Sequence, residues 1–300
     1  MALAQIAFLG IGLMGQPMVA RLLQADYPVT VWNRTQAKTQ ASVALGAVAA
    51  DSIADAVSSA DILITMLEAG NIVIEVVKQA LPYMQKHAIL IDMSSTRQSE
   101  AIELQRLLNQ HDMSFIDAPV SGGVIGAQTG TLAIMVGASS SDFELVQPLL
   151  SAMGTATLVG LPGSGQVAKL CNQLIVGGTL NLVAEALLLA QAGGADPVAV
   201  RQALRGGFAE SRILEVHGQR MLERNFIPGG QVKSQAKDMD NIMALADQVQ
   251  LKLPQAELIA EAYRRQLLTT PHADQSAILL DLENSNQGIR LSQNSTHLPV

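Results

Sequence analysis

The feature that most constrains the fold is a glycine-rich turn near the start of the chain. Four apolar residues at 6–9 run directly into Gly10-Ile11-Gly12-Leu13-Met14-Gly15, and an amphipathic stretch follows to about residue 25. Gly10 permits a tight turn, Gly12 leaves room for a ligand near the backbone, and Gly15 lets the next helix pack on the strand. The pattern predicts a strand, a turn and a helix whose free N–H groups receive the pyrophosphate of a dinucleotide.

The same alternation of aliphatic runs and amphipathic stretches continues to about residue 160. Runs of this length without polar alternation are typical of strands buried on both faces. We expect strands at 6–9, 29–32, 62–66, 89–92, 114–117, 132–136 and 157–159. We expect helices at 13–25, 35–45, 52–59, 70–80, 97–110 and 140–153. The order of these elements predicts an α/β fold with a doubly wound, mostly parallel sheet, which is a Rossmann domain over residues 1–162.

The second half of the chain has a helical pattern throughout. Residues 166–192 are apolar, rich in Ala and Leu and free of proline, so they can form a helix about 40 Å long. Gly193-Gly194 is a stop signal, and Asp196-Pro197 is a start signal for the next helix. Further helices are expected at 197–205, 212–224, 232–250, 255–268 and 274–283. We therefore predict an all-α C-terminal domain over 163–285, on a long interdomain helix, and a mobile tail over 286–300.

Composition excludes several classes of protein. The chain has 300 residues, 49% of them hydrophobic and 15% charged, which is typical of large cores and not of a disordered chain. Its 26 acidic and 19 basic residues give a net charge of −7 without a basic run, so we expect no nucleic-acid partner. The N-terminus lacks a basic leader, no 18-residue span lacks both charge and glycine, and Cys171 is the single cysteine. We expect no membrane partner, a cytoplasmic location and, since the five histidines show no ligand spacing, no metal site.

The residues after the second expected strand indicate which nicotinamide cofactor binds. An acidic residue there would bind the ribose 2′-hydroxyl and repel a 2′-phosphate, but this chain has Asn33-Arg34-Thr35. Arg34 can offer a planar guanidinium to the phosphate, and Asn33 and Thr35 can donate hydrogen bonds. We predict that NADP(H) is preferred and NAD(H) is possible; the alternative is an exposed arginine in an ordinary loop.

Two further segments carry candidate catalytic groups. In the run from Asp117 to Gly123, Ser121 and the N–H groups of Gly122 and Gly123 can form a nest for a carboxylate, although a glycine-rich loop without function is equally compatible. In the run from 163 to 173, Lys169, Asn172 and Gln173 stand at i, i+3 and i+4 and share one helix face. The alternative is a lysine that extends from an amphipathic helix into water.

Together these segments resemble the 3-hydroxyisobutyrate dehydrogenase family of β-hydroxyacid dehydrogenases, over residues 4–284. The motifs that carry the resemblance are at 10–15, 31–35, 91–95, 117–123, 130–132, 163–173 and 237–238. Within the family, the motifs at 169–173, 205–207 and 224–229 are most similar to tartronate semialdehyde reductases. The Trp-Asn-Arg-Thr motif at 32–35 is more similar to the NADPH-using glyoxylate and succinic semialdehyde reductases.

The resemblance implies roles for the residues expected to meet the substrate. Lys169 would be the catalytic acid/base, and Ser121, Gly122 and Gly123 would hold the substrate carboxylate. Asn172 would orient the lysine or the carboxylate. Gln173 stands where the family often has a second Asn, so its longer amide would reach differently.

The resemblance also assigns residues to the cofactor. Lys237 would close over it, with Asp238 beside the active site. Ser95, or Thr96 if the loop register differs, would contact it near the nicotinamide ribose. Leu67 would line the nicotinamide side, next to a glutamate where the family more usually has a proline. Phe208 and Arg212 would border the substrate pocket.

These expectations converge on a metal-independent reductase that transfers hydride from NADPH to a small aldehyde or oxo acid bearing a carboxylate. Glyoxylate, succinic semialdehyde and tartronate semialdehyde are the candidate substrates. One alternative is an imine reductase of the same architecture, although such enzymes commonly carry Asp or Tyr where Lys169 stands. Another alternative is a non-catalytic NADP-binding scaffold protein. We expect a homodimer or homotetramer, because the helical half is more apolar than one subunit can cover.

Overall fold

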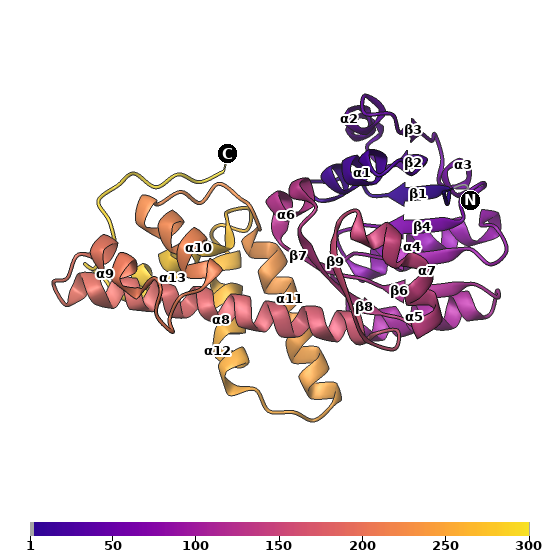
Figure 1. Ribbon diagram of the computed structural model, residues 1–300. Helices are drawn as coiled ribbons and strands as arrows, with labels where there is room; N and C mark the ends of the chain where they lie inside the picture. The colour runs from indigo at the N-terminus through magenta and orange to yellow at the C-terminus, as the bar shows by residue number, and fades with distance from the viewer. Residues whose placement is uncertain (1–2, 300) are drawn as a thin grey trace. The chain divides into compact units, whose positions relative to one another are not determined.

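The computed structural model describes residues 3–299 and divides into two compact units between Lys169 and Leu170 (Figure 1). The first unit is a sheet covered by helices, and the second is helical. This is the predicted class, a Rossmann domain followed by an all-α C-terminal domain. The division falls between 169 and 170 and not between 162 and 163, because the long helix α8 begins in the first unit and continues into the second.

The sheet of the first unit has the order β3-β2-β1-β4-β5-β6-β8-β7, with β9 paired to β8. The strands are β1 (Ile6–Leu9), β2 (Val29–Trp32), β3 (Val48–Ala49), β4 (Ile62–Thr65), β5 (Ile89–Asp92), β6 (Ser114–Asp117), β7 (Val120–Ser121), β8 (Leu132–Gly137) and β9 (Gly154–Gly160). Strands β1 to β6 pair in parallel, whereas β8 is antiparallel to β6 and β7. The two-residue strands β3 and β7 were not predicted.

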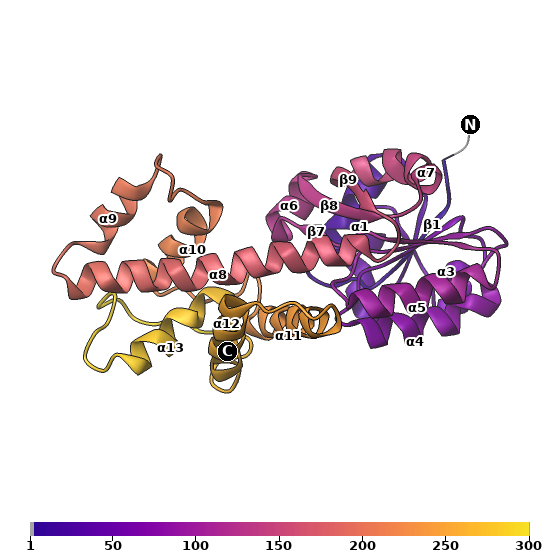
Figure 2. The same cartoon turned by 90° about the horizontal axis from the view of Figure 1, so that it is seen from below.

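Both faces of the sheet are buried, each under its own set of helices. Within β1, Ile6 and Phe8 contribute to one core and Ala7 and Leu9 to the other, because successive side chains point to opposite faces. One face is covered by α1 (Gly15–Gln24), α6 (Gly123–Thr129) and α7 (Ser140–Ser151), and the other by α3 (Ile53–Val57), α4 (Gly70–Ala80) and α5 (Gln98–Asn109) (Figure 2). The short helices η1 (Gln36–Thr39), α2 (Gln40–Val43) and η2 (Leu81–Tyr83) lie in the connections.

The strand register places the predicted functional loops at one edge of the sheet. Leu9 lies opposite both Trp32 and Thr65, Thr65 lies opposite Asp92, and Asp92 lies opposite Asp117. These residues are the last of β1, β2, β4, β5 and β6, so the five loops that follow leave the sheet side by side. Ligands of doubly wound sheets bind at this carboxyl edge.

The second unit consists of most of α8 and five further α-helices among the described residues. Its elements are α8 (Ser164–Ala192), α9 (Pro197–Leu204), α10 (Arg212–Glu223), α11 (Val232–Gln248), α12 (Pro254–Leu267), η3 (Gln275–Ala277) and α13 (Ile278–Ser285). Asp196 caps α9 as predicted, because its carboxylate accepts a hydrogen bond from Val198 N at 3.0 Å. Phe226 and Tyr263 are fully buried in the core of this unit.

The residues after α13 make hydrogen bonds with the helical unit. His297 N donates to Arg224 O, and Phe226 N donates to His297 O, both at 2.9 Å. Arg224 itself is buried and forms an ion pair with Glu283 at 2.7 Å. The mobility predicted for 286–300 stays a prediction, and residue 300 lies outside the described residues.

Helix α8 is also the one helix among residues 3–299 that is long and apolar enough to cross a membrane by length and composition. The core helix of a globular protein meets the same criterion. Its most apolar 18-residue window is 33% buried within the chain.

Candidate active site

The glycine-rich turn has the geometry that dinucleotide binding requires. Gly10 has φ of +108°, which strains any residue with a side chain, and its N–H donates to Trp32 O at 3.0 Å. A Cβ at Gly15 would collide with the carbonyl oxygen of Gly10, so only glycine lets α1 approach the turn this closely. A Cβ at Gly12 would meet nothing within 4 Å, which leaves open space beside the backbone. No side chain caps the N-terminus of α1, which is the end of a helix that attracts an anion.

The loop after β2 is tied to this turn by Asn33. Its side-chain Oδ1 accepts a hydrogen bond from Ile11 N, and its Nδ2 donates to Thr35 O, both at 2.9 Å. Arg34 and Thr35 are exposed. Asn33 therefore fixes the segment that carries Arg34 beside the turn, while the predicted contacts of the three residues with a 2′-phosphate stay predictions.

The loops after β4 and β5 are joined through Ser94, which the sequence analysis did not single out. Leu67 N donates to Ser94 Oγ at 2.9 Å, and Ser94 N donates to Asp92 Oδ1 at 3.1 Å. Ser95 is half-buried, whereas Thr96 is only 1% exposed. The predicted cofactor residues Leu67 and Ser95 are thus held close together, and Ser95 is the more accessible of the two candidates in its loop.

Two buried carboxylates end the neighbouring strands β5 and β6. The pKa of Asp92 is raised to about 6, because the effect of burial is larger than the opposing effect of the hydrogen bonds from Ser94 and Thr65. The pKa of Asp117 is also raised to about 6 by burial. The N–H groups of Gly163 and Gln166 donate to this carboxylate, which opposes the rise in its pKa but does not cancel it. A sequence offers no signal for these partnerships, because the donors to Asp117 lie 46 and 49 positions away.

The predicted catalytic lysine lies next to the predicted carboxylate nest. Lys169 is 9% exposed, and its Nζ donates to Val120 O at 2.9 Å. Ser121 follows at the end of β7, and Gly122 and Gly123 have φ of +133° and +62° at the turn into α6. Both glycines are exposed and Ser121 is half-buried. The structure therefore brings the Lys169 amine to a polar, accessible turn, while the roles that the resemblance implies for these residues stay predictions.

In the helical unit, the amides of α8 interact with α11. Asn172 Nδ2 donates to Gln173 Oε1 at 2.9 Å. Gln173 Nε2 in turn donates to Gln235 Oε1 at 2.9 Å and to Asp238 Oδ2 at 2.7 Å. Lys237 Nζ forms an ion pair with Asp238 at 3.3 Å. Gln173 thus connects two helices of its own unit, and its predicted contact with substrate stays a prediction.

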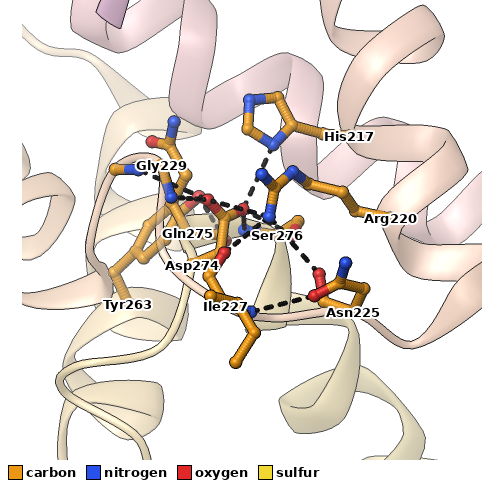
Figure 3. A network of polar contacts seen from close by, with 10 residues as sticks. His217, Arg220, Asn225, Ile227, Gly229, Tyr263, Asp274, Gln275 and Ser276 are labelled. Carbon is orange, nitrogen blue, oxygen red and sulfur yellow. Dashed lines mark hydrogen bonds and ion pairs between the residues drawn. The ribbon is translucent and has the colours of Figure 1, made fainter. Parts of the chain in front are cut away.

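A second polar centre in the helical unit was missed by the sequence analysis (Figure 3). Asp274 is fully buried, and its carboxylate contacts His217 Nδ1 at 3.2 Å and Ser276 Oγ at 2.6 Å. It also accepts from the N–H groups of Gly229 at 3.0 Å and Gly230 at 3.3 Å. Burial alone would raise the pKa of Asp274, but the hydrogen bond and charge of His217, with Ser276 and Gly229, hold it well below its usual range. Asp274 therefore anchors the loop that leads into α11.

Comparison with known proteins identifies the family. Residues 5–165 match the family described as the NAD binding domain of 6-phosphogluconate dehydrogenase. Residues 163–281 match the one described as "NAD-binding of NADP-dependent 3-hydroxyisobutyrate dehydrogenase". A relative from Escherichia coli, named 2-hydroxy-3-oxopropionate reductase, is 40% identical over 263 residues, which are 86% of this chain and 90% of the relative. The chain belongs to the 3-hydroxyisobutyrate dehydrogenase family.

Solved structures agree with this assignment. The 3-hydroxyisobutyrate dehydrogenase of Mycobacterium tuberculosis with L-serine has a TM-score of 0.87 and 30% identity, and the match covers 94% of this chain and 99% of that chain. An imine reductase from Myxococcus stipitatus in complex with NADP+ has a TM-score of 0.62 and 20% identity, and the match covers 93% and 99% of the two chains. The likeness to the imine reductase shows a shared fold alone.

These findings confirm several predictions from the sequence. The chain is an oxidoreductase of the β-hydroxyacid dehydrogenase type, acts on CH–OH groups and binds NAD(P). The family, the Rossmann domain and the helical C-terminal domain are also as predicted. The glycine turn, the start of α1 without a side-chain cap and the exposed Arg34 are features that fit the dinucleotide.

Proposed function

We propose that this member of the 3-hydroxyisobutyrate dehydrogenase family is an NADPH-dependent reductase of small aldehydes or oxo acids that carry a carboxylate. The observation that carries the proposal is the Lys169 amine at 2.9 Å from Val120 O, one residue before Ser121 and its glycines. Tartronate semialdehyde is the first candidate substrate, because the Escherichia coli relative is named 2-hydroxy-3-oxopropionate reductase. Glyoxylate and succinic semialdehyde are the other two.

The chemistry follows from the groups in the Rossmann unit. Ser121 and the N–H groups of Gly122 and Gly123 bind the substrate carboxylate and orient the carbonyl group. Lys169, as an ammonium, donates a hydrogen bond to the carbonyl oxygen and transfers a proton to it as negative charge develops there. The bound nicotinamide supplies the hydride that adds to the carbonyl carbon. In the reverse direction the neutral amine of Lys169 accepts the hydroxyl proton. Asn172, one helical turn further along α8, orients the substrate.

The preference for NADPH is part of the proposal. Arg34 is exposed on the loop after β2. Asn33 Oδ1 accepts a hydrogen bond from Ile11 N at 2.9 Å, which holds this loop and the Arg34 guanidinium beside the glycine turn. A guanidinium pairs with the phosphate that distinguishes NADPH from NADH, and no acidic side chain occupies positions 33–35.

Screening the purified protein tests the proposed function. Oxidation of NADPH is followed by absorbance with tartronate semialdehyde, glyoxylate, succinic semialdehyde and a cyclic imine. We expect turnover with at least one of the three carboxylate-bearing aldehydes and none with the imine. Turnover of the imine alone would favour an imine reductase, and NADPH binding without any turnover would favour a scaffold protein.

We further propose that the helical unit forms a homo-oligomer. Three aliphatic residues of α8 are spaced seven apart and lie largely in solvent, namely Ile175 (68% exposed), Leu182 (65%) and Leu189 (73%). Two residues of this row, Ile175 and Leu182, line an apolar groove of about 760 Å³ that α12 and α13 also border, with Leu258 in its lining. Apolar residues at a seven-residue spacing suit the pairing of one helix with another. We propose that a second copy of the chain covers this row. When two α8 helices pair in antiparallel orientation, the row of each copy is buried against the row of the other.

A further inference from the structure

Gln166 is fully buried near the start of α8. The oxygen and the nitrogen of its side-chain amide both bond to the same loop. Its Nε2 donates to Ser94 O at 2.9 Å, and its Oε1 accepts from Thr96 N at 3.0 Å. The two partners flank Ser95, the residue expected to contact the cofactor near the nicotinamide ribose. The Gln166 amide therefore holds the backbone on either side of Ser95, from 70 and 72 positions away in sequence.

The turn of α8 that carries Gln166 is itself fixed to the sheet. Asp117 Oδ1 accepts from Gly163 N at 2.6 Å, and its Oδ2 accepts from Gln166 N at 2.7 Å. A Cβ at Gly165 would come within 2.6 Å of the carbonyl oxygen of Asp117, so this turn packs directly on the end of β6. The first turn of α8 cannot shift along or around its axis without breaking these contacts.

Lys169 lies three residues after Gln166, which is slightly less than one helical turn and about 4.5 Å along the axis. Side chains three apart project from the same face of a helix. The Ser95 loop and the Lys169 amine are thus connected through Gln166 and one turn of hydrogen-bonded helix, and Val120 O receives the amine at the far end.

We propose that Gln166 is a positioning residue that sets the distance between the Lys169 amine and the Ser95 loop, where the reacting end of the nicotinamide cofactor is received. The inference rests on the proposed function, since it assumes that proton and hydride reach the same carbonyl group. Proton transfer and hydride transfer must be aligned together, and a misplacement of about 1 Å costs up to about 100-fold in rate. Gln166 suits this task because its one planar amide accepts from Thr96 N and donates to Ser94 O, which belong to the same loop.

The first test replaces the amide by a side chain of similar length. In Gln166→Met, Thr96 N and Ser94 O lose their partner, so we expect faster hydrogen exchange at the Thr96 amide in the cofactor-free protein. We expect kcat to fall about 10- to 100-fold, with a dissociation constant for NADPH within about threefold of wild type. With NADPH deuterated at the transferred hydrogen, the kinetic isotope effect on kcat should increase, because the misaligned hydride step then limits turnover.

Gln266→Met is the matched control. Gln266 is also a buried glutamine, and its amide donates a hydrogen bond to Thr270 Oγ1, just after the end of α12 in the helical unit. We expect this variant to lose thermal stability while its kcat, isotope effect and Thr96 exchange stay at wild-type values. Unchanged kcat, isotope effect and exchange in Gln166→Met, or equal changes in the control, would overturn the inference.

A second variant provides a pH readout. The protonated carboxyl introduced by Gln166→Glu can still accept from Thr96 N and donate to Ser94 O, whereas the ionised carboxylate would repel Ser94 O. The group would lie among Asp117 of β6, Asp92 of β5 and Lys169 of α8. We expect activity relative to wild type to be retained in acid and to fall as pH rises, while Gln166→Met shows no such recovery. Equal pH profiles for the two variants would contradict the positioning role. Full turnover by Lys169→Ala, by contrast, would overturn the proposed function and this inference with it.

Discussion

The amine of Lys169 donates a hydrogen bond to the carbonyl oxygen of Val120 across 49 positions of sequence. This contact joins the start of α8 to β7, and it holds a cation beside the turn at Ser121, Gly122 and Gly123. The first prediction concerns this cation. Lys169→Ala should lower kcat at least about 100-fold, because the carbonyl oxygen loses its proton donor. Binding of NADPH, measured by fluorescence titration, should change little.

Lys86→Ala is the control for Lys169→Ala, because it removes an exposed lysine far along the chain from α8. It should leave both turnover and binding at wild-type values. Turnover by Lys169→Ala within threefold of wild type would show that another group supplies the proton.

Arg34 should decide the choice of cofactor. Arg34→Ala removes the guanidinium expected to pair with the 2′-phosphate, so KM for NADPH should rise about 10- to 100-fold, as for the loss of one charge-assisted hydrogen bond. KM for NADH should stay within about twofold, since NADH lacks that phosphate. Lys38→Ala, which removes an exposed cation from the same connection, should not alter the ratio. An equal effect of Arg34→Ala on both cofactors would contradict the assignment.

Asp274 should stabilise the helical unit in a pH-dependent manner. Asp274→Asn weakens the contacts with His217 and with the N–H groups of Gly229 and Gly230, so the free energy of unfolding at pH 7 should fall by about 1–3 kcal/mol. The pKa of Asp274 is lowered in the folded protein. Its stabilisation is therefore present above the unfolded-state pKa of about 3.9 and is lost as pH falls below it.

Urea unfolding of wild type and Asp274→Asn at a series of pH values measures this difference, which should shrink steadily in acid. Asp196→Asn is the control, because Asn caps a helix as well as Asp does and Asp196 is exposed. A difference between wild type and Asp274→Asn that grows as pH falls would reverse the predicted sign.

The exposed row on α8 should determine the oligomeric state. We expect the wild-type protein to sediment as a dimer or tetramer, and Leu182→Glu to sediment as a smaller species, because a charge then lies in the middle of the buried row. Leu145→Glu places the same charge on α7 of the Rossmann unit, at a leucine that is 69% exposed, and should leave the oligomer intact. A monomeric wild-type protein would exclude the proposed assembly.

The elements that could be predicted from the sequence are those with a local signal. The run at 6–9 is followed by Gly10, Gly12 and Gly15, and both periodicity and turn chemistry agree on β1 and α1. The helix α8 differs from its predicted range only in starting at Ser164. By contrast, α6 was not predicted, because Gly123, Gly126 and Gly130 mask the helical pattern over Gly123–Thr129.

The residues of the candidate site also differ in whether the sequence carries a local signal for them. Lys169, Ser121 and Arg34 could be proposed from residue type and motif, because each chemical role requires that kind of group. Gln166 and Asp274 could not, since what they do depends on backbone groups that are 70 and 45 positions away. For Gln173, the resemblance implies a contact with substrate, which stays a prediction, and nothing in the sequence indicates that its amide bonds Gln235 and Asp238.

Helix α8 runs without interruption through the point where the two units divide, between Lys169 and Leu170. A loop at that point could gain or lose a residue with little effect on either side. In a helix each added residue turns whatever follows by about 100° around the axis, so one insertion after Lys169 would carry Asn172 to a different face. We therefore expect the number of residues between Gly163 and Gln173 to be fixed, because an insertion or deletion there would disturb the helix more than it would disturb a loop.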